Sequence, residues 1–465
     1  MVIALIVATA LFMQNLDSTI IATALPTMAA SFGESAVHLS LAITAYLLSV
    51  AVFIPVSGWV ADRFGAREVF CAAIGVFTLG SVLCGLSNSL VELTGARIVQ
   101  GLGGAMMVPV GRLVLMRNIG KSELVRAMSY LTTPAILGPV IGPPLGGFIT
   151  TYWSWRWIFF LNVPVCLLGV VLVLTMIKNP PRESEVPPLD TGGFALTAMA
   201  LTCLTFGIDL LAHPAAGGLT IAALLFAGLA VATVAVAHAK RHPHPLLDLS
   251  LLDIPTFAVT IYAGTLYRIS AGALPFLLPV MLQVGFGLSA FDSGSITFAS
   301  AIGAFANKVT IHRVLRRFGY RATSVGTGAA SAVSLLLCAF FQAWWPAWTM
   351  FAILLIGGFF RSLQFTSLNS LAFADIPHSK MSAATTLSTM IQQITNGVGV
   401  ALGAILLNAA LLWRGDATLV TGDFHAAFVV VAAVCLASAL GFLRLAPEAG
   451  ADVSGHKRGK EMPAE

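Results

Sequence analysis

Charged residues are scarce in this chain. Asp, Glu, Lys and Arg make up 10% of its 465 residues, whereas hydrophobic residues make up 57%. Soluble domains carry about 25% charged residues, so the composition excludes that class and predicts many membrane spans of about 20 residues each. The net charge is +5, but the basic residues form no stripe with interleaved aromatics, so no nucleic-acid partner is expected.

Cysteines and catalytic motifs are equally sparse. The six cysteines are scattered through apolar runs, and they form no CxxC pair and have no His at metal-ligand spacing. No nucleophile–base set is found, and no Walker lysine follows the glycines at Gly101–Gly104. The sequence therefore predicts no enzyme, no metal and no cofactor, and it gives no support to ATP as the energy source.

Long hydrophobic runs fill the chain instead. The first run lacks the positively charged start of a signal peptide and continues past Asp17, so it is predicted to be a span. We predict an all-α integral membrane fold with fourteen transmembrane helices, at residues 2–25, 36–60, 68–88, 90–117, 125–150, 156–178, 190–211, 217–238, 254–282, 289–312, 321–342, 345–373, 381–412 and 424–446.

The basic residues are distributed unevenly between the two predicted sides. With the N-terminus in the cytoplasm, only Arg156 and Arg414 lie in outer loops. Such an asymmetry, with tryptophans gathered at the outer ends, is typical of a multi-pass protein of the bacterial inner membrane. We predict both termini in the cytoplasm, and the inner basic residues are Arg63, Arg67, Arg117, Lys121, Arg126, Lys178, Arg182, Lys240, Arg241, Lys308, Arg313, Arg316, Arg317, Arg321, Lys380, Arg444, Lys457, Arg458 and Lys460.

A short internal repeat indicates two related halves. Arg63-Phe-Gly-Ala-Arg67 follows the second predicted helix, and Arg317-Phe-Gly-Tyr-Arg321 follows the tenth. Parallel repeats of six helices are a transporter architecture. We therefore predict a six-helix bundle at residues 1–178, a linker with two extra helices at 179–248, a second six-helix bundle at 249–447 and a cytoplasmic tail at 448–465.

Asp17 is the carboxylate that lies deepest in a predicted span. Burial raises the proton affinity of such a group and a nearby arginine lowers it, which suits a residue that binds and releases protons. Arg97 lies at a similar depth in the fourth helix. We predict proton coupling through these two residues; a permanent structural ion pair is the alternative.

Three further arginines lie within spans without a local acid: Arg112, Arg268 and Arg361. An interior with excess positive charge attracts an anionic or carboxylate-bearing substrate. The alternative is that these side chains bond backbone carbonyls or reach the membrane surface. Uncharged polar residues add substrate contacts or interhelical hydrogen bonds, and we predict a cavity that includes Gln14, Gln364, Asn369 and Gln393.

Four motifs stand out: Leu16–Pro26 in the first helix, Gly58–Arg67 after the second, Arg97–Gly101 in the fourth and Gly138–Gly147 in the fifth. Together they resemble the major facilitator superfamily, in its fourteen-helix drug:proton antiporter branch of the EmrB and QacA type, and most of all its MdtD- and HsrA-like bacterial members. Two positions depart from the pattern: Ala22 stands where the first motif usually has Asn, and Ala66 where the loop motif usually has a basic residue.

The resemblance implies two bundles that give alternating access to a central cavity. It assigns a cytoplasmic gate to Gly58, Asp62, Arg63, Gly65 and Arg67, with Asp62 meeting the start of the third helix and the two arginines as its partners. It assigns the antiporter motif, a sliding interface of small residues, to Gly138, Pro139, Gly142, Pro143, Gly146 and Gly147.

The function expected on this basis is a monomeric, proton-driven antiporter that exports small organic molecules of the multidrug type. An exporter of a metabolite anion or amino-acid-like compound on the same fold is an alternative. A non-transporting membrane sensor is the alternative from another class, although a tail of about twenty residues after Arg444 is short for a signalling domain. A channel is disfavoured because its pore usually lies on a subunit axis.

The topology can be tested by labelling single cysteines in a cysteine-free background. A cysteine at Lys240 should react only with a membrane-permeant reagent, and a cysteine at Arg414 should also react with an impermeant one. Labelling of position 240 from outside, or a map with only twelve spans, would contradict the predicted topology.

Overall fold

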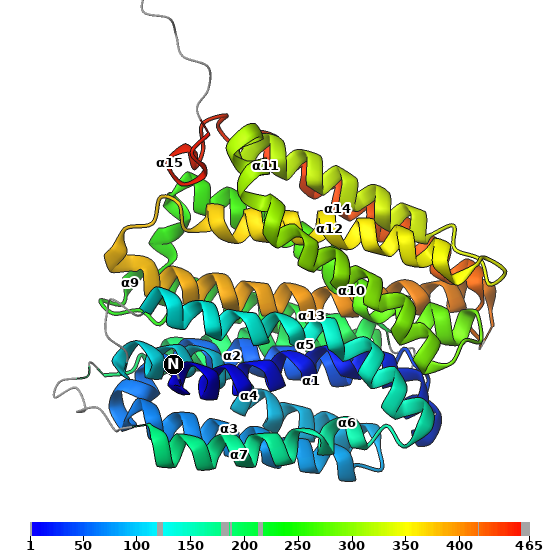
Figure 1. Cartoon of the computed structure of the whole chain (residues 1–465), viewed down its shortest axis with the longest axis horizontal. Helices are drawn as coiled ribbons and strands as arrows, with labels where there is room; N and C mark the ends of the chain where they lie inside the picture. Colours follow the sequence, from blue (N-terminus) through cyan, green and yellow to red (C-terminus); the bar gives the residue numbers. More distant parts are fainter. Residues whose placement is uncertain are drawn as a thin grey trace, which may run out of the picture.

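The computed structural model of the chain is a bundle of long helices (Figure 1). It describes residues 2–118, 124–177, 186, 188–212, 217–416 and 418–456, and in these ranges it contains no strand. Six of the predicted inner basic residues (Lys121, Lys178, Arg182, Lys457, Arg458 and Lys460) and residues 457–465 of the predicted tail lie outside the described residues. The predicted all-helical membrane fold is confirmed.

Helices of the first half pack into one group. They are α1 (Val2–Phe32), α2 (Ser40–Phe64), α3 (Ala66–Leu86), α4 (Leu90–Asn118), α5 (Leu124–Tyr152), α6 (Trp157–Phe160) and α7 (Asn162–Met176). The predicted sixth helix is thus divided into α6 and α7, and the first runs beyond its predicted end through Pro26. Apolar side chains of α1 to α4 and α7 form a continuous buried core.

Helices of the second half form another group, joined to the first by two inserted helices. The inserted helices are α8 (Thr191–Asp209) and α9 (Gly218–Arg241). The second group consists of α10 (Pro255–Val280), which continues as a π-helical turn (Met281–Gly285), α11 (Ala290–Cys338), α12 (Ala347–Ala372), α13 (Met381–Arg414), α14 (Thr421–Gly441) and the short α15 (Ala451–Ser454).

Eleven helices in the described ranges are long and apolar enough to cross a membrane. The predicted spans outside this set are the fifth, in α5, and the two that α11 combines. In α9, Gly228 is buried and the other residues are partly or fully exposed. α9 packs mainly on α8, whereas α8 also contacts α2 and α13. Because apolar side chains cover nearly all of α9, this helix is built to face lipid.

The internal repeat marks a sharp corner in each half. Gly65, between α2 and α3, has φ 99° and ψ 128°, and Gly319, inside α11, has φ 70° and ψ 175°. Both conformations are accessible to glycine and costly for residues with a Cβ. Gly319 therefore divides α11 into two helical segments. Lys308 and Arg313, predicted in a loop, instead lie on exposed positions of the first segment.

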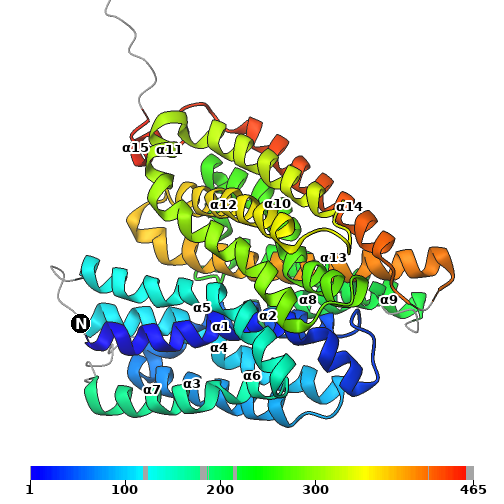
Figure 2. The ribbon, with the colours of Figure 1, turned by 45° about the vertical axis from the view of Figure 1, so that its right-hand side comes forward.

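The two groups meet at the end of the molecule opposite the N-terminus. There the Gln283 side-chain amide donates to the Thr23 carbonyl at 2.9 Å, and the Phe291 N–H donates to the Thr151 hydroxyl at 3.0 Å. In Figure 2, α5 and the first segment of α11 lie close near that end and separate towards the N-terminus. The structure therefore closes the end that the topology predicts to be outer.

Replacing Gly319 with Ala should destabilise the protein by about 1–3 kcal/mol, because a Cβ strains this backbone conformation. Gly326→Ala is the matched control, since Gly326 lies in the same helix and an added Cβ would meet nothing within 4 Å. Thermal unfolding of both variants in detergent checks this, and equal melting temperatures would contradict it.

Candidate functional site

A buried network of polar side chains surrounds Asp17 in the first bundle. Arg97 lies on α4, and its NH1 pairs with the Asp17 Oδ2 at 2.6 Å; both side chains are fully buried. The other carboxylate oxygen, Oδ1, accepts from the Gln100 amide at 2.9 Å and from the Asn162 amide at 2.8 Å. Ser81 on α3 accepts from both amides. One carboxylate thus holds α1, α4 and α7 together.

Arg97 also belongs to the wall of a cavity. Its guanidinium lies 4.2 Å from the centroid of the Tyr46 ring, and its Nε donates to the Ala42 carbonyl at 3.3 Å. Its NH2 has no hydrogen-bond partner among the described residues. The guanidinium therefore links the buried Asp17 carboxylate to the space between the bundles.

That space is a cavity of 310 Å³ between the two bundles. α1, α2 and α4 form one wall, and α10, α12 and α13 form the other. Amide, hydroxyl and arginine side chains line it together with apolar ones, and no carboxylate is among the lining residues. Its polar lining consists of Gln14, Asn15, Ser18, Thr19, Tyr46, Arg97, Tyr267, Arg268, Gln392, Gln393 and Asn396.

Three of the predicted cavity residues line this cavity, namely Gln14, Arg268 and Gln393. The other four, Arg112, Arg361, Gln364 and Asn369, are not among its lining residues. Arg361 donates to the hydroxyls of Ser300 and Ser334 behind the wall, and Gln364 accepts from Thr327.

Arg112 has an exposed side chain, and Asn369 is half-buried away from the cavity. Position within a span did not reveal which side of its helix each residue occupies.

Glycines of the predicted antiporter motif bring α5 against α1. Gly138, Gly142 and Gly146 are spaced by four residues, and an added Cβ at each would collide in turn with Asn15 and Leu16, with Thr19, and with Ile20 and Thr23. Small residues at this spacing let two backbones approach closely. The motif therefore forms the contact between α1 and α5.

The same motif also reaches across to the second bundle. An added Cβ at Gly147 would collide with the backbone of Ala290, and one at Gly294 would collide with the backbone of Pro143. Pro139 and Pro143 also line a smaller cavity of 230 Å³ with residues of α10 and α11. α5 thus packs on both bundles, as a sliding interface requires.

Residues of the predicted gate cluster at the opposite end of the first bundle. Asp62 pairs with Arg117 of α4 at 2.7 Å, a partner that the sequence analysis did not name. Arg67 donates to the Leu174 carbonyl of α7, and Arg63 is exposed. Gly58 faces open space. These contacts fasten the end of α2 to α4 and the start of α3 to α7.

The profile of the Major Facilitator Superfamily matches residues 7–400 and 260–464 of this chain. The chain belongs to the major facilitator superfamily. It is therefore a membrane transporter and not an enzyme, and the predicted resemblance is confirmed.

Relatives of this transporter carry the name of a multidrug resistance protein. MdtD of Citrobacter koseri is 39% identical over 403 residues, which cover 86% of this chain and 85% of the relative. MdtD of Salmonella heidelberg matches with the same identity and coverage.

Solved structures of remote sequence have the same fold. A D-xylose–proton symporter aligns with a TM-score of 0.68 at 14% identity, over 96% of this chain and 98% of that one. An auto-inhibited peptide transporter of the POT family aligns with a TM-score of 0.66 at 14% identity, over 100% of this chain and 98% of that one.

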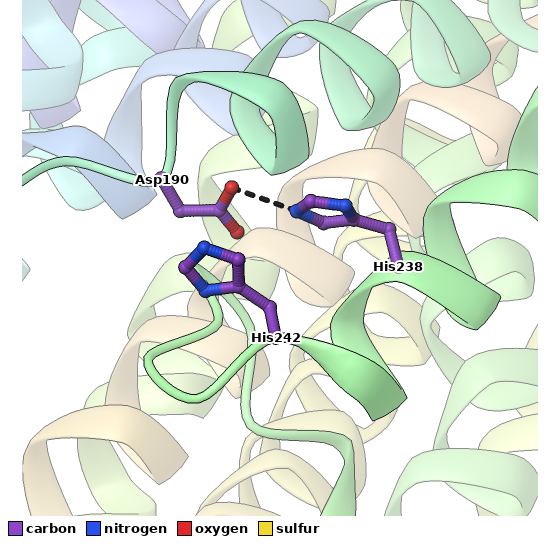
Figure 3. Close-up of side chains that lie close together, drawn as sticks. All are labelled: Asp190, His238 and His242. Carbon is purple, nitrogen blue, oxygen red and sulfur yellow. Dashed lines mark hydrogen bonds and ion pairs between the residues drawn. The ribbon is translucent and has the colours of Figure 1, made fainter.

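A group of potential metal ligands lies where the two inserted helices of the transporter meet (Figure 3). The ligand atoms of Asp190, His238 and His242 lie within 4.8 Å of one another, and Asp190 is 2.8 Å from the His238 Nε2. Sequence reasoning did not bring these three residues together. The HxxxH spacing was a signal for the group, but 48 residues separate Asp190 from His238.

Asp190 already has a structural role in this group. It caps α8 by accepting from the Gly193 N–H at 2.7 Å, and it accepts from the Leu246 N–H at 3.2 Å. Burial raises the pKa of the Asp190 carboxyl, but these bonds and His238 outweigh burial and hold the pKa below its usual range. The ionised carboxylate thereby joins the start of α8 to the end of α9.

Sequence reasoning missed several members of the Asp17 network and the cavity. Ser81, Asn162 and Tyr46 are common residues in apolar runs, and no motif marks them. Gln100 was inside the quoted Arg97–Gly101 motif, and its three-residue spacing from Arg97 places both side chains on one face of a helix. That spacing was a usable signal.

Gly142→Ala should lower the stability of the transporter by roughly 1–3 kcal/mol, because the added methyl group overlaps Thr19. Thr19→Ala in the same chain should restore part of the loss by removing the Oγ1 atom. Gly169→Ala is the control, since a Cβ there meets nothing within 4 Å. Unfolding midpoints that show no coupling between positions 142 and 19 would contradict this interface.

Proposed function

We propose that this transporter is a proton-coupled antiporter that exports small organic molecules from the bacterial cytoplasm by alternating access. The name of its relatives supports the multidrug type of cargo. The observation that carries proton coupling is the buried Asp17 carboxylate, which is tied through Arg97 to the wall of the central cavity. The cargo occupies the cavity between the bundles.

Asp17 is suited to exchange a proton because its charge has a single cationic partner. Protonation neutralises the carboxylate and removes its attraction for Arg97, while the Gln100 and Asn162 amides keep the side chain in place. The net charge beside the cavity then rises by one unit. Proton binding and substrate binding are therefore linked free energies, and each changes the affinity for the other.

Alternating access requires one end of the pathway to close as the other opens. Contacts between α5 and α11 hold the outer end, and the small residues of α5 allow that contact to slide. At the inner end, the Asp62–Arg117 pair and Arg67 keep the first bundle rigid. Arg63 is exposed there and is available to contact the second bundle when the inner end closes.

Asp17→Asn should abolish export against a concentration gradient, because the side chain keeps its shape but can no longer change charge. We expect substrate binding to persist with a flattened dependence on pH. Proteoliposomes with an imposed pH gradient, an entrapped pH dye and a panel of cationic, neutral and anionic drugs measure both quantities.

Asp209→Asn is the matched control, since Asp209 is also a buried carboxylate and accepts from Thr44 at 3.2 Å at the end of α8. This variant should keep proton-driven export. Because Asp17→Asn leaves Arg97 without its anion, the neutral double variant Asp17→Asn/Arg97→Gln separates loss of coupling from loss of folding. Uphill export with normal pH dependence in Asp17→Asn would place the proton site elsewhere.

A further inference from the structure

Three arginines are buried inside the described part of the transporter: Arg97, Arg268 and Arg361. Arg97 has the Asp17 carboxylate, and Arg361 donates to the hydroxyls of Ser300 and Ser334 at 3.0 and 3.3 Å. Arg268 has neither kind of partner. Its Nε, NH1 and NH2 atoms are all buried and all lack a hydrogen-bond partner among the described residues.

An unpaired buried guanidinium is costly for a folded protein. Arg268 is 1% exposed, and burying a charge without a counter-charge or hydrogen bonds costs several kcal/mol. No described residue neutralises the guanidinium. The glycine at position 264, one turn earlier on α10, leaves space beside it, because an added Cβ there would lie 3.0 Å from NH1. Since no described residue supplies the missing partner, a partner from outside the chain is expected.

The central cavity is where such a partner can reach Arg268. This side chain lines the wall formed by the second bundle, and the amides of Gln14 and Asn15 line the opposite wall. Because no Asp or Glu is among the lining residues, a bound cation would meet no compensating charge there. A carboxylate would fit the planar fork of a guanidinium in a bidentate manner.

We propose that Arg268 is the binding site for the carboxylate of an organic anion in the central cavity. The neighbouring amides of Gln393 and Asn396 donate to the same group or to other polar atoms of the cargo. This inference rests on the proposed function for the export of that anion, but its binding test does not depend on transport. Arg361 has no part in the site, because its guanidinium is satisfied behind the cavity wall.

Two probe series of matched size and different charge test the site. They are benzoate, benzamide and benzamidine, and 2-naphthoate with its amide and amidine. The detergent-purified full chain at pH 7.5 should bind the carboxylates and bind the amidines at least tenfold more weakly, by calorimetry or ligand-induced thermal stabilisation. Equal binding of amidines and carboxylates, or no binding of either carboxylate, would overturn the proposal.

Arg268→Met supplies the decisive comparison because it removes the charge and keeps an unbranched side chain. Carboxylate affinity should fall about 10- to 100-fold, as expected for lost hydrogen bonds to a charged group. The melting temperature of the empty protein should stay the same or rise, because an unpaired buried charge has been removed. A large fall in that temperature would show that Arg268 is structural and would overturn the proposal.

Arg361→Met is the matched control in α12. It should lower the melting temperature, because Ser300 and Ser334 lose their donor, and it should keep carboxylate affinity. Carboxylate binding that survives Arg268→Met refutes this proposal alone, whereas uphill export with normal pH dependence in Asp17→Asn refutes only the proposed proton coupling.

Discussion

The architecture depends on how a charge is kept inside an apolar bundle. Asp17 and Arg97 lie fully buried at 2.6 Å, and removal of one member of such a pair typically costs about 3–5 kcal/mol because the other charge is left uncompensated. Gln100, Asn162 and Ser81 complete the hydrogen bonds. α1, α4 and α7 are therefore held in one arrangement by a set of mutually dependent polar groups.

The contacts between the two bundles differ in kind from the contacts within the first bundle. Within the bundle, charged pairs and amide bonds fix the helices. Between the bundles, the backbones of α5 and α11 approach each other at Pro143 and Gly147, and the rings of Phe148 and Tyr152 contact Phe291 at the outer end. A contact of this kind maintains close packing while one backbone shifts along the other. Fixed contacts within a bundle and sliding contacts between bundles together suit alternating access.

The three buried arginines show how the surroundings, and not the residue type, decide a role. One is neutralised by a carboxylate, one is satisfied by hydroxyls, and one faces the cavity without a partner. We propose that the third gains its partner from a bound organic anion, which would offset the stability that its unpaired charge costs the empty protein.

The sequence alone determined the fold class, through its hydrophobic runs, the repeated corner motif and the spacing of the α5 glycines. Short stretches of sequence suffice for this, because both membrane spans and close helix contacts depend on local residue patterns. They also identified Asp17, Arg97 and Arg268 as unusual. Only the tertiary structure decided that Asp62 pairs with Arg117, that Arg361 turns away from the cavity, and that Asn162 and Ser81 join Asp17. These contacts join residues 27 to 145 positions apart. The sequence of a helix does not show which of its sides faces a neighbouring helix, a cavity or lipid. Packing against the other helices decides this for each residue.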